Sequence, residues 1–226
     1  MPVASRPPSV YRLAFRGRFY DVWQLAPGLQ DSLLEHFPLG RPGEPGVRPA
    51  CGRVRSLARR AAAAGGRLAV ARAPVATRVD LAAATTGGDT APVPRLAGAV
   101  YPGKEARFDA TVEVRKAGPH VVFAGGAFRR RLEVSIDARR VSAERHLLSH
   151  AGHFEPLGRV ELARGSHRVA IRYEPAAAAP GSGGPAFPLG PLYVVPVSDP
   201  RVELVAPRSA RRICGRRLDW IESVSR

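Results

Sequence analysis

Three histidines lie close together around residue 150, at a spacing that a zinc site can use. On a helix, His146 and His150 would share one face, and His153 would supply a third nitrogen ligand. Gly152 and the β-type pattern on both sides of this segment favour a loop instead. We therefore predict a polar loop at the rim of a sheet, assign no metal and no cofactor, and keep the three histidines as alternative ligands.

Acidic side chains offer a second kind of chemistry, because a glycosidase needs two carboxylates about 5–9 Å apart across a cleft. Asp109, Glu113 and Asp137 occupy predicted strands, where acidic residues are typical of a solvated sheet face. The sequence contains no G-x-S-x-G motif, phosphate-binding loop or dinucleotide fingerprint. We assign no catalytic residue and expect no catalytic activity from this chain.

Sugar binding would use aromatic rings, which stack on the apolar faces of sugars while neighbouring polar groups take the hydroxyls. We predict ligand-binding side chains in loops and near strand ends: Tyr101, Phe128, His153, Phe154 and Phe187. Phe108 and Tyr173 are expected to face the core. Rings at strand ends also commonly cap a core, and that alternative stays open.

The two cysteines, Cys51 and Cys214, are far apart in the sequence. They could be two unrelated buried thiols, as is usual in a cytosolic protein, or they could form a disulfide in an oxidising compartment. A catalytic thiol has no accompanying histidine motif to support it. The residues alone leave the first two alternatives open.

The back half of the chain has the period of two that is typical of half-buried strands. Apolar and polar residues alternate from Phe108 to Arg115, and similar runs follow at 132–136, 160–162, 167–173, 192–197 and 202–205. Turn residues separate these runs at intervals of about 8–12 residues, which is typical of a sandwich or jelly roll. We predict a mainly β protein, with an antiparallel, jelly-roll-like β-sandwich over residues 98–207.

The front of the chain, residues 1–97, is predicted to be a small α/β unit followed by a linker. We expect a hairpin over Tyr11–Gln24, a helix over Cys51–Ala64 and a short strand over Leu68–Val75. The stretch Thr85–Pro94 has the composition of a surface linker.

The formal net charge is +16, which taken alone indicates a polyanionic partner such as nucleic acid, anionic lipid or an acidic glycan. The basic residues are nearly all arginine, with lysine only at Lys104 and Lys116, and this is also the expectation for a GC-rich genome. We expect the positive charge to be spread over all faces and keep nucleic-acid binding only as an alternative function.

No stretch of the chain approaches the roughly 18 apolar residues of a membrane helix. The N-terminal residues also lack the apolar region of a secretory signal. We expect neither a transmembrane segment nor a signal peptide within this sequence.

Three passages together resemble a known group of proteins. They are Tyr20-Asp21-Val22-Trp23-Gln24, the Arg/Ala helix opened by Cys51, and the stretch from Cys214 through Asp219-Trp220-Ile221 to Glu222. The pattern resembles the C-terminal extracytoplasmic region of polytopic membrane proteins of actinobacteria, many of which look like cell-envelope glycosyltransferases. The central strands separately resemble carbohydrate-binding jelly rolls.

The resemblance implies an extracytoplasmic, non-catalytic module that binds a glycan or polyprenyl-glycan, or that supports a membrane glycosyltransferase. The alternative within the same class is a structural or protein-interaction domain without a ligand. An extracytoplasmic location favours a Cys51–Cys214 disulfide. The tail, residues 208–226, carries Leu218, Trp220 and Ile221. We expect it to dock on the front hairpin, over its exposed rings Tyr20 and Trp23.

Overall fold

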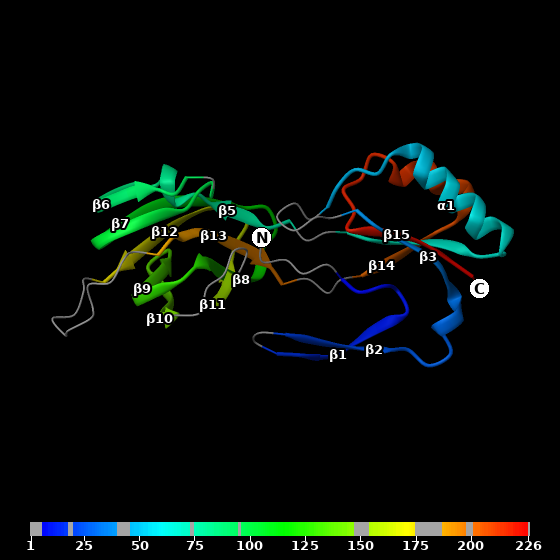
Figure 1. Cartoon of the computed structure of the whole chain (residues 1–226), viewed down its shortest axis with the longest axis horizontal. Helices are drawn as coiled ribbons and strands as arrows, with labels where there is room; N and C mark the ends of the chain where they lie inside the picture. The colour runs from blue at the N-terminus through cyan, green and yellow to red at the C-terminus, as the bar shows by residue number, and fades with distance from the viewer. Residues whose placement is uncertain are drawn as a thin grey trace. The chain divides into compact units, whose positions relative to one another are not determined.

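The structure is a computed structural model that describes residues 6–17, 20–39, 46–72, 75–94, 96–146, 154–174, 187–197 and 201–225 (Figure 1). The chain divides into two compact units. The first consists of Val3–Pro74 together with Ser198–Arg226, and the second of Val75–Val197. In sequence, the second unit is therefore an insertion into the first.

The second unit is an antiparallel β-sandwich, which confirms the predicted fold class. One layer has the strand order β6-β7-β12-β9-β10 and the other the order β5-β13-β8-β11, and the pair Leu189–Val100 links the layers. The elements are β5 (Thr77–Val79), a 3₁₀ turn η2 (Leu81–Ala83), β6 (Thr85–Pro92), β7 (Val100–Val114), β8 (Gly118–Gly126), β9 (Phe128–Ile136), β10 (Arg139–His146), β11 (Phe154–Leu162), β12 (Gly165–Tyr173) and β13 (Leu189–Pro196).

The core of the sandwich is made by alternate residues of both layers, as period-two patterning requires. Phe108 and Tyr173 are buried, as predicted. Other core side chains come from β8, β9, β12 and β13: Val122, Ala124, Phe128, Leu132, Val134, Ile136, Val169, Ile171, Leu192 and Val194.

The predicted linker at Thr85–Pro94 is wrong, because β6 (Thr85–Pro92) pairs with β7 over that stretch. Most of its side chains are exposed, since β6 is an edge strand with β7 on one side. An edge strand rich in Gly and Thr lacks the apolar alternation that marks half-buried strands. The sandwich unit consequently begins at Val75.

The first unit contains a four-stranded antiparallel sheet in the order β14-β4-β15-β3. The hairpin β1 (Tyr11–Arg16) and β2 (Asp21–Leu25) forms where the sequence predicts it. The other elements are a 3₁₀ turn η1 (Gln30–Ser32), β3 (Leu33–Pro38), α1 (Cys51–Ala63), β4 (Arg67–Ala71), β14 (Val202–Val205), a 3₁₀ helix η3 (Pro207–Ile213) and β15 (Trp220–Val224).

Helix α1 follows from the spacing of its apolar residues, as predicted. Val54, Leu57, Ala58 and Ala61 are buried on one face, against η3 and strands β4, β14 and β15. The helix ends at Ala63, and the amides of Gly65, which has a positive φ of 63°, and Gly66 bond back to carbonyls of the last turn.

One expectation about the C-terminal part is wrong. Val202–Val205 does not belong to the sandwich but forms β14, which pairs with β4. The tail does dock on the front unit, as the strand β15 inserted between β4 and β3, and Arg6 lies over both its Trp220 ring and the Trp23 ring of the hairpin. The apolar Trp220 and Ile221 are thereby fully buried in a sheet.

Candidate functional site

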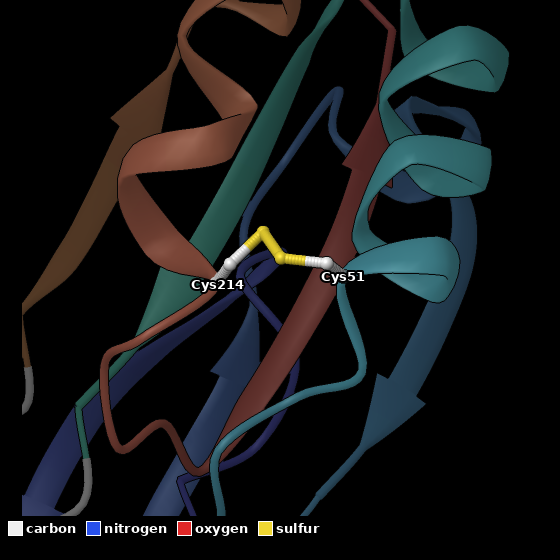
Figure 2. Close-up of a disulfide and its surroundings, with 2 residues drawn as sticks. All are labelled: Cys51 and Cys214. Carbon is white, nitrogen blue, oxygen red and sulfur yellow. A yellow bond between two sulfur atoms is a disulfide. The ribbon is translucent and has the colours of Figure 1, made fainter.

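Cys51 and Cys214 form a disulfide, with a Cα–Cα distance of 5.1 Å across 163 residues of sequence. Figure 2 shows the bond joining the first turn of α1 to the chain just after η3. The predicted pair is therefore confirmed. Disulfides persist in oxidising compartments, so the bond is more typical of a protein outside the reducing cytosol.

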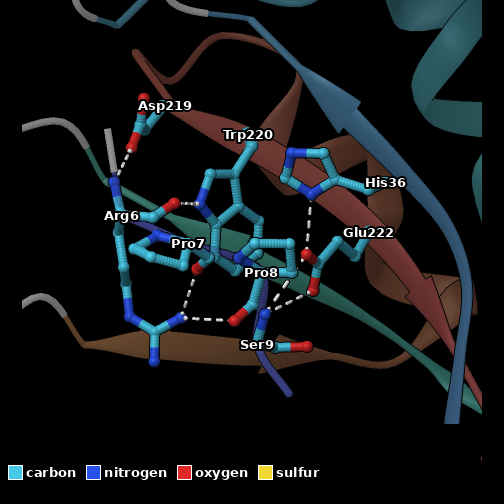
Figure 3. A network of polar contacts seen from close by, with 8 residues as sticks. All are labelled: Arg6, Pro7, Pro8, Ser9, His36, Asp219, Trp220 and Glu222. Atoms are coloured by element: carbon cyan, nitrogen blue, oxygen red, sulfur yellow. Dashed lines mark hydrogen bonds and ion pairs between the residues drawn. The ribbon is translucent and has the colours of Figure 1, made fainter. Parts of the chain in front are cut away.

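On the sheet face opposite α1, polar contacts fasten residues 6–9 to β15 (Figure 3). The buried Glu222 accepts the Ser9 backbone N–H at 3.0 Å and His36 Nδ1 at 2.7 Å. Trp220 Nε1 donates to the Arg6 carbonyl at 2.7 Å. Burial lowers the pKa of the Arg6 guanidinium, and the negative charge of Glu222 partly offsets that effect. These contacts hold the N-terminal segment in place.

Four arginines line an open groove between α1 and η3. Arg55 and Arg59 come from α1, Arg208 and Arg211 come from η3, and all four are exposed. The groove has a volume of about 650 Å³, and small residues make up the rest of its lining: Gly52, Ala58, Ala62, Pro207 and Ala210. Here the positive charge is gathered rather than evenly spread, so the expectation of an even distribution does not hold at this place. We call it the arginine groove.

The predicted sugar-binding rings lie in different surroundings. Phe128 is fully buried in the sandwich core and cannot meet a ligand at the surface in this structure, because it occupies an inward position of β9. Tyr101 lies on β7 and is 37% exposed. Phe154, at the start of β11, and Phe187, before β13, are half-buried, and His153 lies outside the described residues.

Phe154 lies opposite Gly125 of β8, beside a row of side chains across the outer surface of the layer β5-β13-β8-β11. The register places Arg78, Tyr193, Phe123 and Pro156 opposite one another on successive strands. Their neighbours Val79, Leu192, Val122 and Leu157 are buried in the core, so the row points away from it.

The Phe154 and Tyr193 rings meet edge to face, with their centroids 5.3 Å apart. Phe123 and Phe154 are half-buried, whereas Tyr193 is only 9% exposed and lies largely beneath its neighbours. We call Phe123, Phe154 and Tyr193 the aromatic face. Sequence reasoning missed two of its three rings.

Charged groups border the aromatic face. Arg78 donates to Asp80 Oδ2 at 2.7 Å, and Asp80 also accepts the Ala82 backbone N–H at 3.1 Å. Burial raises the pKa of the Tyr193 hydroxyl, while the charge of Arg78 and its hydrogen bond oppose this rise. Rings beside an arginine–carboxylate pair could stack on a sugar and bond its hydroxyls.

Two of the acidic residues considered for glycoside hydrolysis, Asp109 and Asp137, have cationic partners. Asp109 pairs with Arg168 at 2.7 Å. Asp137, in the two-residue turn between β9 and β10 with φ of 48°, lies 2.5 Å from His167 Nδ1 and accepts the Arg168 backbone N–H. These contacts fasten the turn to β12.

His167 lies between two acceptors, which favours its protonated form. Nδ1 faces the Asp137 carboxylate, and Nε2 lies 2.9 Å from the Ala163 carbonyl, so both nitrogens need a proton to donate. The bond to Asp137, and then the bond to Ala163, raise the pKa of His167 against the opposing effect of burial. The bond from His167, and then that from Arg168, lower the pKa of Asp137.

Most of the histidine segment proposed as a zinc site lies outside the described residues. The side chain of His146, at the end of β10, and the whole of His150 and His153 lie outside the described residues. Among the side chains that the structure does describe, no group of three His, Cys, Asp or Glu is arranged to hold a metal ion. In the same part of the chain, no helix has the length and hydrophobicity that crossing a bilayer requires.

No protein-family model matches the chain, and no curated protein matches it either. Solved structures similar to it include a Podospora anserina GH26-CBM35 β-(1,4)-mannanase, with a TM-score of 0.41 and 16% identity over 56% of this chain and 28% of that one. Another is the CBM36-1 domain of a multidomain xylanase from the hindgut metagenome of Trinervitermes trinervoides (TM-score 0.37, 14% identity, 55% of this chain, 99% of that one). A third is an exo-β-1,3-galactanase from Phanerochaete chrysosporium (TM-score 0.37, 15% identity, 54% and 30%).

The chain thus spans less than a third of the mannanase and the galactanase. Carbohydrate-binding and glycan-active proteins are among these neighbours, but at TM-scores below 0.5 the likeness carries no argument about function. None of the three is a polytopic membrane glycosyltransferase, so that part of the sequence resemblance stays a prediction.

Proposed function

We propose that this chain is a non-catalytic, glycan-binding module of the cell envelope, and that the aromatic face of its sandwich is the binding platform. The observation that carries the proposal is the gathering of Phe123, Phe154 and Tyr193 on adjacent strands, on the side away from the core. Rings arranged in this way can stack on the C–H surfaces of successive sugar units.

The charged border supplies the polar half of such a site. Arg78 and Asp80 lie at the end of the row next to Tyr193, with 42% and 32% of their side chains exposed. A guanidinium offers several donors and a carboxylate several acceptors, so together they can bond neighbouring hydroxyls of one sugar. A neutral glycan suits this arrangement because the pair is already balanced in charge.

The disulfide supports the localisation part of the proposal. A Cys51–Cys214 bond indicates an oxidising compartment, where envelope glycans are also found. Attachment to a membrane glycosyltransferase at the extracytoplasmic face of the membrane is the context that the sequence resemblance implies. A protein-interaction role without a glycan is the rival, since aromatic side chains are also enriched at protein interfaces.

The test is affinity electrophoresis of the whole chain through gels containing mannan, xylan, galactan or arabinan. The proposal expects retardation in at least one gel, and Phe154→Ala should weaken it about tenfold, as loss of a central stacking ring does. Phe15→Ala is the matched control, because Phe15 is 54% exposed in the β1–β2 hairpin of the other unit.

Tyr101→Ala tests a second place on the sandwich, since Tyr101 is another of the rings predicted from the sequence and is exposed on β7. Loss of binding through Tyr101 and not through Phe154 would refute the aromatic face. Absence of retardation in all four gels would refute glycan binding and favour the interaction role.

A further inference from the structure

The arginine groove gathers four guanidinium groups from two segments that are about 150 residues apart in sequence. Arg55 and Arg59 are one turn apart on α1, so they lie on the same side of the helix. Arg208 and Arg211 are separated by one turn of the 3₁₀ helix η3, which likewise places them together. The two pairs face a common space.

Carboxylates neutralise other arginines of the same unit but not these four. Glu35 binds both Arg53 and Arg60 of α1, and Glu203 binds Arg72 and Arg216. For the four groove arginines, no ion pair with a carboxylate is found within residues that the structure describes.

Like charges held together without a counter-charge repel one another, and an anion in the groove would relieve that repulsion. Helix α1 therefore presents neutralised arginines towards β3 and unneutralised ones towards η3.

The groove also has room for a ligand between the guanidinium groups. Its floor includes Ala58 and Ala210, which are 6% and 3% exposed, and Gly52 and Ala62 widen it at the level of α1. Small side chains leave the space of about 650 Å³ open to solvent. Guanidinium groups bind phosphate oxygens with two parallel hydrogen bonds, so four of them can surround a small oxyanion from both sides.

The Cys51–Cys214 disulfide holds the two walls of the groove together. Cys51 is the first residue of α1 and Cys214 directly follows η3, so the bond ties the segment carrying Arg55 and Arg59 to the one carrying Arg208 and Arg211 (Figure 2). Fixing both segments lets their guanidinium groups lie near one another despite their mutual repulsion. Preorganisation of this kind lowers the cost of binding an anion.

We propose that the arginine groove binds a ligand carrying two linked phosphate groups. Each of two linked phosphate groups carries at least one negative charge at neutral pH, so a diphosphate offsets a large part of the charge of four guanidinium groups. Arg55 and Arg59 are about 6 Å apart along the helix axis, which limits the charged region to the size of a diphosphate. The site lies in the first unit and goes beyond the neutral-glycan platform of the sandwich.

A nucleic acid fits the groove less well. Single strands are bound along extended basic tracks with aromatic side chains on which bases stack. The groove is short, and its lining contains no aromatic residue.

The test is isothermal titration of the whole chain with inorganic pyrophosphate at low ionic strength. We expect saturable binding that orthophosphate matches only at higher concentration and that added salt weakens. Arg59→Gln/Arg211→Gln, one arginine from each wall, should weaken binding at least about tenfold. Arg115→Gln/Arg164→Gln removes the same charge from exposed arginines of the sandwich and should leave binding unchanged.

Two further arms identify the source of the phosphate and test the role of the disulfide. Phosphatidylcholine vesicles containing diacylglycerol pyrophosphate report on a lipid headgroup with two linked phosphates, and pyrophosphate in solution reports on a soluble ligand; binding to either through Arg59 and Arg211 supports the proposal. Cys51→Ser/Cys214→Ser should weaken pyrophosphate binding several-fold in protein whose circular dichroism is unchanged.

Three outcomes would overturn the proposal. They are no saturable binding of pyrophosphate or of the vesicles, equal losses in the groove variant and the sandwich control, and tighter binding of a single-stranded oligonucleotide than of pyrophosphate. None of these results affects the test of neutral-glycan binding through Phe154. The proposal for the arginine groove and the proposal for the aromatic face can therefore be refuted independently of each other.

Discussion

Removing the disulfide tests how the first unit is held together. Cys51→Ser/Cys214→Ser opens a loop of 163 residues, which corresponds to about 5 kcal/mol in the chain-entropy relation. If the sandwich, Val75–Val197, stays folded while the first unit unfolds, about 123 of those residues are already fixed and roughly 40 remain free, which lowers the figure to about 4 kcal/mol. We expect the free energy of unfolding of the first unit to fall by about 4 kcal/mol.

Intrinsic fluorescence can follow this unit by itself. The chain has two tryptophans, Trp23 in β2 and Trp220 in β15, and both belong to the first unit. Unfolding in guanidinium chloride monitored by tryptophan fluorescence therefore reports the first unit, and far-UV circular dichroism is dominated by the strands of the sandwich. Wild-type protein reduced with dithiothreitol is the control, because it lacks the bond but keeps both cysteine side chains.

A specific pattern would refute the reasoning. If the fluorescence transition of the variant lies within about 1 kcal/mol of wild type, the bond does not restrain the unfolded chain as the loop-entropy argument requires. If fluorescence and circular dichroism shift equally, the two units unfold together, and the distinction between the long and the shortened loop is wrong.

Three more outcomes are expected. The pKa of His167 is raised in the folded protein, so its contribution to the free energy of unfolding is full below about pH 6.5 and is lost as the pH rises through the raised pKa. The pKa of Asp137 is lowered, so its contribution to the free energy of unfolding is present above about pH 4 and is lost as the pH falls through the lowered pKa. The urea midpoint of the sandwich should thus decline from pH 6 to pH 9, and Asp137→Asn should flatten the decline; an unchanged slope would contradict this. Gly66→Ala would place a Cβ 1.8 Å from a carbonyl oxygen of β15, so it should cost about 3 kcal/mol or more by fluorescence-monitored unfolding, whereas Gly215→Ala, with nothing within 4 Å, should be close to neutral. Glu222→Ala should cost about 2–3 kcal/mol in the same assay because it leaves the amide and imidazole donors unpaired in a buried place, and a loss below about 0.5 kcal/mol would speak against that role.

The sequence predicts strands well where one face of the strand is buried, because the alternation is then local. The run from Phe108 to Val114 is an example, with its apolar residues inside and its polar ones outside. The local sequence pattern of a strand does not show which sheet the strand will join. Val202–Val205 is a short β-type run that follows the sandwich strands in sequence, yet its partner is β4, about 130 residues earlier in the chain.

Some residues of the candidate sites could be predicted from the sequence, and others could not. The cysteine pair was within reach, since the chain has only two cysteines and an apolar tail that must be buried. Phe123 and Tyr193 lie in nearly continuous apolar runs, where the pattern does not distinguish the inner face from the outer one. The groove arginines cannot be told apart from other arginines in a chain of net charge +16, because only the positions of Glu35 and Glu203 show which ones are neutralised.

The position of β15 in the middle of its sheet determines the order in which the chain can fold as it is synthesised. Strand β4 ends at Ala71, and its two neighbours begin only at Val202 and Trp220. At ribosomal rates of about 5–20 residues per second, roughly 8–30 s pass between β4 and β15. All strands of the sandwich emerge in that interval. The segment that is made first is consequently completed last, and the apolar residues of β4 wait without a sheet partner until the C-terminal strand arrives.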